Sequence, residues 1–250
     1  MTDLKNKVAL ITGSARGLGR AIAERFAGLG ADIIINYSKD SFSANEAVVN
    51  IQALGVRVIA VQADISKPAD IENLFAEAKK AFGKIDIVVA NAGVELADVP
   101  VTDFTEEQFD RLFAINTKGT YFTIQCAAKN IEDNGRIINI SSTSAAFPFP
   151  GFAVYGGSKT APNYLVEVLA KEIGYRGVTV NSIVPYAVAN AGIFTGMDTH
   201  TPELKWLSDM NPMKRMATVE DVSNAAVFFA SNLSSFVSGQ HLIVNGGGSQ

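Results

Sequence analysis

The chain has 250 residues, of which 48% are hydrophobic and 18% are charged, and its formal net charge is −4. This length allows one well-buried core and is short for two domains, and the composition excludes a disordered chain. The weak negative charge disfavours nucleic acid and anionic membranes as partners. No apolar stretch reaches about 18 residues, so we expect neither a signal peptide nor a membrane span and predict a cytoplasmic protein.

The side chains that build metal sites and serine-hydrolase sites are scarce. Cys126 is the only cysteine, and His200 and His241 are the only histidines. One cysteine excludes an intrachain disulfide and a cysteine-based zinc site, and no G-x-S-x-G motif is present. We therefore expect no metal site and no Ser-His-Asp triad, and we interpret Cys126 as a buried structural thiol.

Short apolar runs alternate with amphipathic stretches along the whole chain. Strands are predicted at residues 7–13, 31–38, 56–64, 84–93, 135–142, 178–185 and 240–247. Helices are predicted at residues 15–30, 43–55, 68–83, 105–131, 155–174 and 219–232. The strands are continuously apolar, as in sheets that are covered on both faces. Repeated strand–helix units predict an α/β fold, a doubly wound parallel sheet with helices on both faces, formed by residues 1–250 as a single domain.

The loop after the first strand reads TGSARGLG, with Gly13, Gly17 and Gly19 ahead of a predicted helix. Glycines let the backbone turn tightly and approach a pyrophosphate, and a helix N-terminus offers free N–H groups and a positive dipole end. A glycine triplet alone is weak evidence, but this one lies between a strand and a helix, as dinucleotide binding requires. We therefore predict a dinucleotide site at this loop.

The end of the second strand indicates which dinucleotide binds. An NAD site usually carries an acid about 20 residues after the glycine loop, where it holds the ribose diol. This chain instead has Tyr37, Ser38 and Lys39 there, and Arg16 inside the loop. These groups suit a 2′-phosphate, so NADPH is favoured over NADH. Asp40 leaves NADH as the alternative cofactor, because its carboxylate could turn toward the ribose.

Several short motifs together resemble the short-chain dehydrogenase/reductase family over nearly the whole chain. They are TGSARGLG at 12–19, ANAG at 90–93, Asn116 in FAINTKG, Ser142 in NISS, YGGSK at 155–159 and NGG at 245–247. The resemblance implies a single Rossmann domain, a nicotinamide cofactor and a catalytic group made of Ser142, Tyr155, Lys159 and Asn116. The spacing of Tyr155 and Lys159 is narrower than in the enoyl reductases of the same superfamily.

The resemblance also gives these residues their roles. Ketone reduction adds a hydride to carbon and a proton to oxygen, and Tyr155 would supply the proton. The Lys159 ammonium, one helical turn away, would lower the pKa of the phenol together with the cationic nicotinamide. Ser142 would hydrogen-bond the substrate oxygen as charge develops, and Asn116 would hold a water that links Lys159 to solvent.

Residues expected to contact the cofactor follow from the same resemblance. They are Gly13, Arg16, Leu18, Gly19, Tyr37, Ser38, Asp64, Ile65, Asn91, Ala92, Gly93, Tyr155, Lys159, Pro185 and Val188. The chain departs from the family at Tyr186, where glycine is common, and at Asn190, near the position of a threonine that binds the carboxamide. These departures leave only Pro185 and Val188 as expected nicotinamide contacts in this segment, and Tyr186 should crowd the pocket.

Aromatic residues cluster in the segments expected to bind the substrate. Candidates are Ser144, Phe152 and Tyr186 first, and then Val94, Glu95, Phe147, Phe149, Phe194 and Trp206. As a set they suggest an apolar pocket for a bulky or aromatic ketone, under a lid formed by about residues 186–216. We therefore predict an NADPH-dependent carbonyl reductase or secondary-alcohol dehydrogenase.

Other interpretations remain open. A 3-oxoacyl-thioester reductase is the alternative within enzymes, although residues 91–100 lack the basic side chain expected for an acyl-carrier-protein partner. A catalytically idle nucleotide-binding sensor or scaffold is the alternative of another class, and it should have lost part of the catalytic group. The family resemblance and two apolar helix faces, at 113–127 and 164–169, predict a homotetramer.

Overall fold

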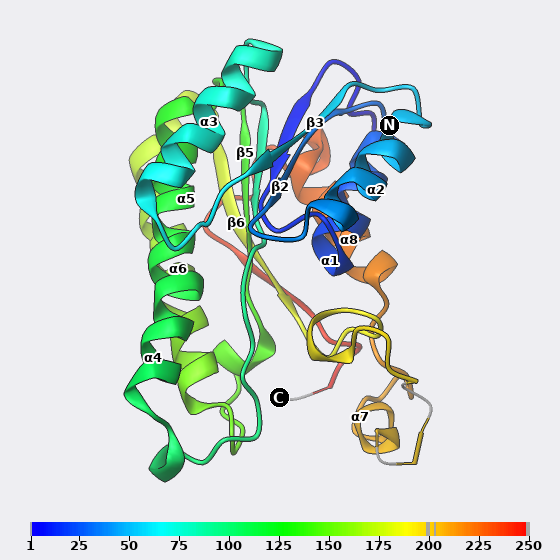
Figure 1. The fold of residues 1–250 in the computed structure, drawn as a ribbon, viewed down its shortest axis with the longest axis vertical. Helices are drawn as coiled ribbons and strands as arrows, with labels where there is room; N and C mark the ends of the chain where they lie inside the picture. The colour runs from blue at the N-terminus through cyan, green and yellow to red at the C-terminus, as the bar shows by residue number, and fades with distance from the viewer. Residues whose placement is uncertain (1, 199–200, 203, 249–250) are drawn as a thin grey trace.

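The computed structural model describes residues 2–198, 201–202 and 204–248, and in this part of the chain seven strands form one sheet (Figure 1). The strand order is β3-β2-β1-β4-β5-β6-β7, and every neighbouring pair is parallel. The strands are β1 (Val8–Ile11), β2 (Asp32–Tyr37), β3 (Val58–Gln62), β4 (Ile87–Ala90), β5 (Arg136–Ile140), β6 (Thr179–Pro185) and β7 (His241–Val244). This order reverses direction between β1 and β4, which confirms the predicted doubly wound sheet.

Helices cover both faces of the sheet, as Figure 1 shows. One face packs against α1 (Gly17–Ala27), α2 (Ser41–Gln52) and α8 (Val219–Ala230). The other packs against α3 (Pro68–Phe82), α5 (Thr120–Asn130) and α6 (Ala153–Ile173). Alternate β1 residues join the two cores, since Ala9 and Ile11 belong to the first and Val8 and Leu10 to the second. Burial on both faces explains the continuously apolar strands.

The predicted long helix at 105–131 is interrupted in the middle. It begins as α4 (Glu106–Leu112), which Thr105 and Gln108 cap reciprocally, and ends as α5. Between them, Phe113–Gly119 winds as a π-helix. Apolar periodicity does not distinguish these windings, so the interruption was not predicted. Such segments recur at functional sites, and this one contains Asn116.

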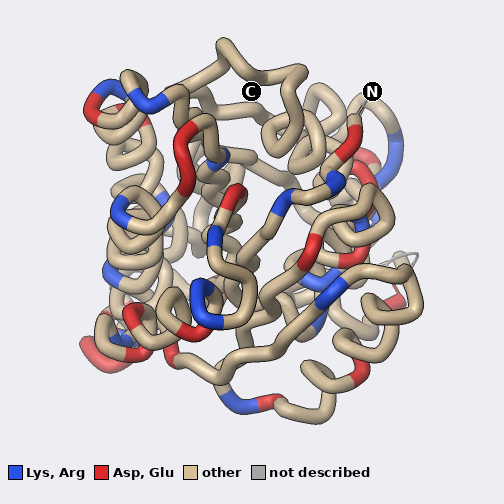
Figure 2. The backbone as a smooth tube through the Cα atoms, turned by 90° about the horizontal axis from the view of Figure 1, so that it is seen from above, with Lys and Arg blue, Asp and Glu red and all other residues tan. Residues whose placement is uncertain are grey.

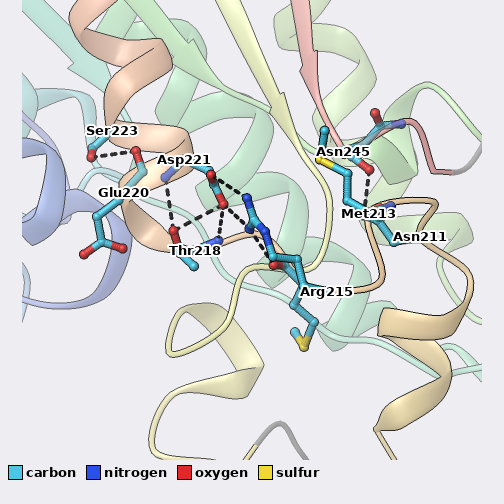
Figure 3. A network of polar contacts seen from close by, with 9 residues as sticks. Asn211, Met213, Arg215, Thr218, Glu220, Asp221, Ser223 and Asn245 are labelled. Carbon is cyan, nitrogen blue, oxygen red and sulfur yellow. Dashed lines mark hydrogen bonds and ion pairs between the residues drawn. The ribbon is translucent and has the colours of Figure 1, made fainter.

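The segment at 186–216 contains more structure than its irregular sequence suggested. It includes a 3₁₀ turn at Gly192–Phe194 and the short helix α7 (Lys205–Asp209). Its end is tied to the rest of the fold by two polar contacts shown in Figure 3. Arg215 donates two hydrogen bonds to Asp221 in the first turn of α8, and the Asn211 amide donates to the Asn245 carbonyl at 2.8 Å.

Acidic and basic residues are interspersed along the backbone in the view of Figure 2. Among the described residues, none of the helices has the length and apolar character needed to cross a membrane. Cys126 lies buried on α5, as expected, and burial raises the pKa of its thiol. His241 pairs with Glu167 of α6 at 2.8 Å, and His200 lies outside the described residues.

Candidate functional site

The glycine loop lies at the carboxyl end of β1, where the strand order reverses. Open α/β sheets bind their ligands in this position. The loop is held by Asn36, whose Oδ1 accepts from the Gly13 N–H at 3.0 Å, and by Asn91, whose Nδ2 donates to the Thr12 carbonyl at 2.9 Å. The sequence alone assigns no role to Asn36 or Thr12, because their role depends on contacts between strands.

Two glycines of the loop have no room for a side chain. A Cβ at Gly13 would lie 2.9 Å from the Cα of Ala92, and a Cβ at Gly19 would lie 2.5 Å from Nδ2 of Asn91. The ANAG motif therefore packs directly on the glycine loop. Gly13 and Gly17 also adopt positive φ angles of 62° and 56°, which favour glycine.

The N-terminus of α1 is left available for an anion. Arg16 occupies the N-cap position without a side-chain cap, and the first turn, which includes Leu18, carries no acidic residue. Its N–H groups and dipole therefore face no carboxylate of their own turn, as phosphate binding requires.

The end of β2 opens onto a cavity of about 530 Å³. The cavity is lined by Ser38, Lys39, Gln62, Asp64, Lys67, Asp70 and Asn73. Lys67 is a second cation there that sequence reasoning missed, because it follows β3. Asp40 does not turn toward the strand ends as a ribose ligand would. Its carboxylate caps α2 by accepting from the Ser43 N–H at 3.0 Å and hydroxyl at 2.7 Å.

Asp64 and Ile65 lie just beyond β3. The Asp64 carboxylate accepts from the Ser66 N–H at 3.0 Å and hydroxyl at 2.8 Å, which fixes its orientation. Ile65 is buried, and its carbonyl oxygen would be only 2.7 Å from a Cβ at Gly119. The turn after β3 thus packs on the π-helix that carries Asn116.

Ser142, Tyr155 and Lys159 come together where β5 ends beside α6. A side-chain hydrogen bond joins Ser142 to Tyr155, and the Ser142 Oγ also accepts from the Ser144 N–H at 3.2 Å. Tyr155 and Lys159 are buried one helical turn apart, and Nζ of Lys159 donates to the Ile140 carbonyl at 3.1 Å. An ammonium has three donors, so others remain for further partners.

The pKa of Tyr155 shifts in the direction opposite to the one expected. Burial raises it, the nearby Glu95 carboxylate raises it further, and only the Ser142 hydrogen bond lowers it. Burial also lowers the pKa of Lys159 to about 8, against the opposing pull of Glu95. Desolvation disfavours charge on both groups.

The Asn116 side chain holds the backbone after β4 through both ends of its amide. Its Oδ1 accepts from the Val94 N–H at 2.8 Å, and its Nδ2 donates to the Val94 carbonyl at 2.8 Å and to the Ser158 Oγ at 3.0 Å. These contacts use both N–H groups of the amide, and Oδ1 keeps one acceptor position for the water that we expected Asn116 to hold. Asn116 also fixes the loop after β4 against α6.

Gly93 fits between the side chains of Asn116 and Lys159. A Cβ at this position would lie 3.0 Å from Nζ of Lys159 and 3.1 Å from Oδ1 of Asn116. The ANAG motif therefore ends on glycine because these two side chains occupy the space beside it.

The end of β6 and the residues just beyond it include the expected nicotinamide contacts and the two departures from the family pattern. Pro185 is buried and pairs with Val244, and Val188 is buried and bridges to Ala217. Tyr186 is half-buried, and burial raises its pKa. Asn190 is exposed with a φ of 58°, a conformation that asparagine tolerates better than most residues.

Aromatic side chains form a row of rings from Tyr155 to the segment at 186–216. The Phe152 ring lies edge-on to Tyr155 at 6.3 Å and to Phe149 at 5.8 Å, and Phe149 stacks on Trp206 of α7 at 6.2 Å. Phe149 and Trp206 remain 46% and 44% exposed, so this row of rings ends at a surface open to a ligand. Ser144 lies at the same end of β5 and accepts from the Ser142 hydroxyl at 3.2 Å.

Comparison with known proteins identifies the family of the chain. A family model described as enoyl-(acyl carrier protein) reductase matches residues 13–249. A tetrahydroxynaphthalene reductase of Pestalotiopsis fici is 38% identical over 97% of this chain and 91% of its own length. A short-chain dehydrogenase of Burkholderia cenocepacia, solved with NADP, superimposes with a TM-score of 0.91 at 32% identity, over 98% of both chains. The promiscuous reductase LugOII catalyses keto-reduction at C1 during lugdunomycin biosynthesis. Its structure superimposes on this one with a TM-score of 0.90 at 34% identity, again over 98% of both chains.

The chain therefore belongs to the short-chain dehydrogenase/reductase family. It is an NAD(P)-dependent oxidoreductase that acts on carbonyl and CH–OH groups.

Proposed function

We propose that the protein is an NADPH-dependent carbonyl reductase that reduces a bulky or aromatic ketone to a secondary alcohol. The observation that carries this proposal is the cluster of Ser142, Tyr155 and Lys159 at the carboxyl edge of the sheet, beside the glycine loop. A phenol, a hydroxyl and an ammonium at one point can bind a carbonyl oxygen and protonate it.

A nicotinamide cofactor held at the glycine loop, beside Gly13 and the N-terminus of α1, would supply a hydride to the carbonyl carbon. Tyr155 donates its proton to the carbonyl oxygen, and its raised pKa keeps the phenol protonated and ready for this step. Ser142 hydrogen-bonds the same oxygen as negative charge develops. Lys159 stabilises the phenolate that remains, and its anchorage on the Ile140 carbonyl holds the ammonium in place.

Four observations support NADP(H) as the cofactor. The uncapped N-terminus of α1 suits the pyrophosphate, and Lys39 and Lys67 line the cavity at the end of β2 where a 2′-phosphate would lie. Asp40 is committed to capping α2 and is therefore a poor ligand for a ribose diol. The Burkholderia cenocepacia relative was solved with NADP.

The row of aromatic rings from Tyr155 to Trp206 supports the proposal of a bulky aromatic substrate. Its exposed end at Phe149 and Trp206 offers ring faces to a planar ligand. Two relatives, the tetrahydroxynaphthalene reductase and LugOII, are reductases, and the first is named for an aromatic substrate. We propose that residues 1–250 act as one domain, with the segment at 186–216 as a lid that carries Trp206 over the substrate.

The test is a panel of aryl ketones, aliphatic ketones and a 3-oxoacyl thioester, each with NADPH and with NADH. We expect aryl ketones with NADPH to give the highest kcat/KM. A clear preference for the thioester would identify the alternative reductase. Cofactor binding without turnover of any substrate would identify a sensor and refute the proposal.

We further propose that the protein is a homotetramer. Phe109, Tyr121 and Tyr164 are large apolar residues that remain 44%, 44% and 70% exposed on α4, α5 and α6, where a second copy can cover them. Sedimentation at micromolar concentration tests this proposal, and a monomer alone would refute it.

A further inference from the structure

Glu95 is a carboxylate beside the reactive side chains that the proposed reaction does not use. It follows Val94, whose N–H and carbonyl are both bound by Asn116 at 2.8 Å. Because Val94 is held on both sides, the backbone from which the Glu95 side chain departs is fixed relative to Asn116 and α6.

The Glu95 carboxylate lies against the segment at 186–216 and within electrostatic range of the reactive pair. A Cβ at Gly192 would be 3.2 Å from its Oε2, and the Ile193 backbone N–H donates to it. Its negative charge acts on both Tyr155 and Lys159 and raises the pKa of each.

This carboxylate has more acceptor capacity than partners. Two carboxylate oxygens offer about four acceptor positions. Among the described residues, the Ile193 N–H is its only hydrogen-bond donor and no cation forms an ion pair with it. Burial raises its pKa despite the attraction of Lys159, so the charged form is under-solvated. The side chain nevertheless keeps intermediate exposure, and a ligand can therefore reach it.

We propose that Glu95 is a specificity-determining residue that accepts a hydrogen bond from a hydroxyl group of the substrate, so that the enzyme selects hydroxylated aryl ketones. A hydroxyl fits better than an ammonium, because Lys159 lies within electrostatic range and would repel a substrate cation. The inference rests on the proposed ketone reduction and adds the substituent that the ketone must carry.

A hydrogen bond to a charged acceptor is worth about 10- to 150-fold in affinity. A site built to bind a hydroxyl discriminates against analogues without one, since its own acceptor is then left unpaired. We therefore expect at least one hydroxylated ketone to exceed its unsubstituted parent by about tenfold or more in kcat/KM.

The experiment compares 1-tetralone with its ring-hydroxylated isomers, the matching methyl ethers and an aminomethyl derivative. The measured quantity is the ratio of kcat/KM for each derivative to kcat/KM for 1-tetralone. In the wild type the preference should appear for a hydroxyl and vanish for its methyl ether. In Glu95→Leu the hydroxyl preference should be lost, and in Glu95→Gln it should fall to an intermediate value, because a neutral acceptor is weaker. Asp98→Asn, which removes an exposed carboxylate from the same loop, is the matched control and should keep the wild-type ratio.

The outcomes separate the two proposals. If wild type reduces 1-tetralone but shows no hydroxyl preference, or if both Glu95 variants keep that preference, the inference about Glu95 is wrong and the ketone reductase remains. A preference for the aminomethyl derivative also overturns it. If no ketone is reduced with either cofactor, the proposed function and the inference fail together.

Discussion

The Thr117 hydroxyl donates a 2.8 Å hydrogen bond to the carbonyl of Ser158. Ser158 lies four residues before Pro162 in α6, and a proline has no N–H to complete the helical hydrogen bond to that carbonyl. Thr117 belongs to the π-helix at 113–119, so the missing bond within one helix is replaced by a bond from the other. This contact, together with that of Asn116 to Ser158, holds the π-helix against the helix that carries Tyr155.

Replacing Thr117 by valine should destabilise the protein through the Ser158 carbonyl. A buried acceptor left without a donor costs about 1–3 kcal/mol, and about 1 kcal/mol lowers the Tm of a chain of this size by about 2–4 °C. Pro162→Ala restores an N–H four residues after Ser158, so Thr117→Val should cost much less in that background. Denaturant unfolding of the four proteins in this cycle measures the coupling. Equal costs in the two backgrounds would show that the hydroxyl does not replace the helical bond.

Replacing Tyr155 by phenylalanine should nearly abolish ketone reduction while the cofactor still binds. The change removes only the hydroxyl that donates the proton, and general acid catalysis is worth about 10²- to 10⁴-fold. Single-turnover kinetics and cofactor titration measure the two effects separately. A variant that kept more than about half of the wild-type kcat would rule out Tyr155 as the acid.

Ketone reduction should decline as the pH rises through the pKa of Lys159, which burial lowers to about 8. Above that pH the ammonium loses its proton, and the phenolate left by proton transfer loses its cationic neighbour. Glu95 raises the pKa of both Lys159 and Tyr155, so Glu95→Gln should lower both and move the alkaline limb to lower pH. Profiles of kcat/KM from about pH 6 to about pH 10 test this, with Asp98→Asn as control. A shift to higher pH would contradict the assigned sign.

Gly93→Ala should impair activity much more than stability. The new methyl group would lie 3.0 Å from Nζ of Lys159 and 3.1 Å from Oδ1 of Asn116, so the ammonium must move. Small displacements of catalytic groups are costly, and we expect about a tenfold loss of kcat or more. Gly174→Ala is the matched control, because a Cβ there meets nothing within 4 Å. If both variants keep wild-type kcat, the space beside Lys159 does not matter for catalysis.

Arg16→Ala should weaken the affinity for NADPH about 10- to 150-fold and leave the affinity for NADH nearly unchanged, because a charge-assisted contact to the 2′-phosphate is lost. Tyr37→Asp should shift the preference toward NADH, because the acid repels the phosphate and binds the ribose diol. Arg25→Ala, in the last turn of α1, is the control and should change kcat/KM for neither cofactor. The measurement is kcat/KM for both cofactors in all four proteins. A wild type that prefers NADH would overturn the cofactor assignment.

The sequence by itself predicted the sheet, the glycine loop between β1 and α1, and the grouping of Ser142, Tyr155 and Lys159. Apolar runs, glycine spacing and the interval from Tyr155 to Lys159 are relations between near neighbours in the chain, and local geometry turns them directly into strands, a turn and a shared helix face. The boundaries of most elements followed within a few residues for the same reason.

Only the tertiary structure decided the pKa shifts of those residues and the contacts that hold them. The raised pKa of Tyr155, the engaged amide of Asn116 and the capping role of Asp40 depend on which distant segments pack together. Glu95 lies sixty residues before Tyr155 in the chain, yet its charge reaches the phenol. Burial and Coulomb energy depend on distance in space, which sequence spacing does not express for segments that meet only in the folded protein.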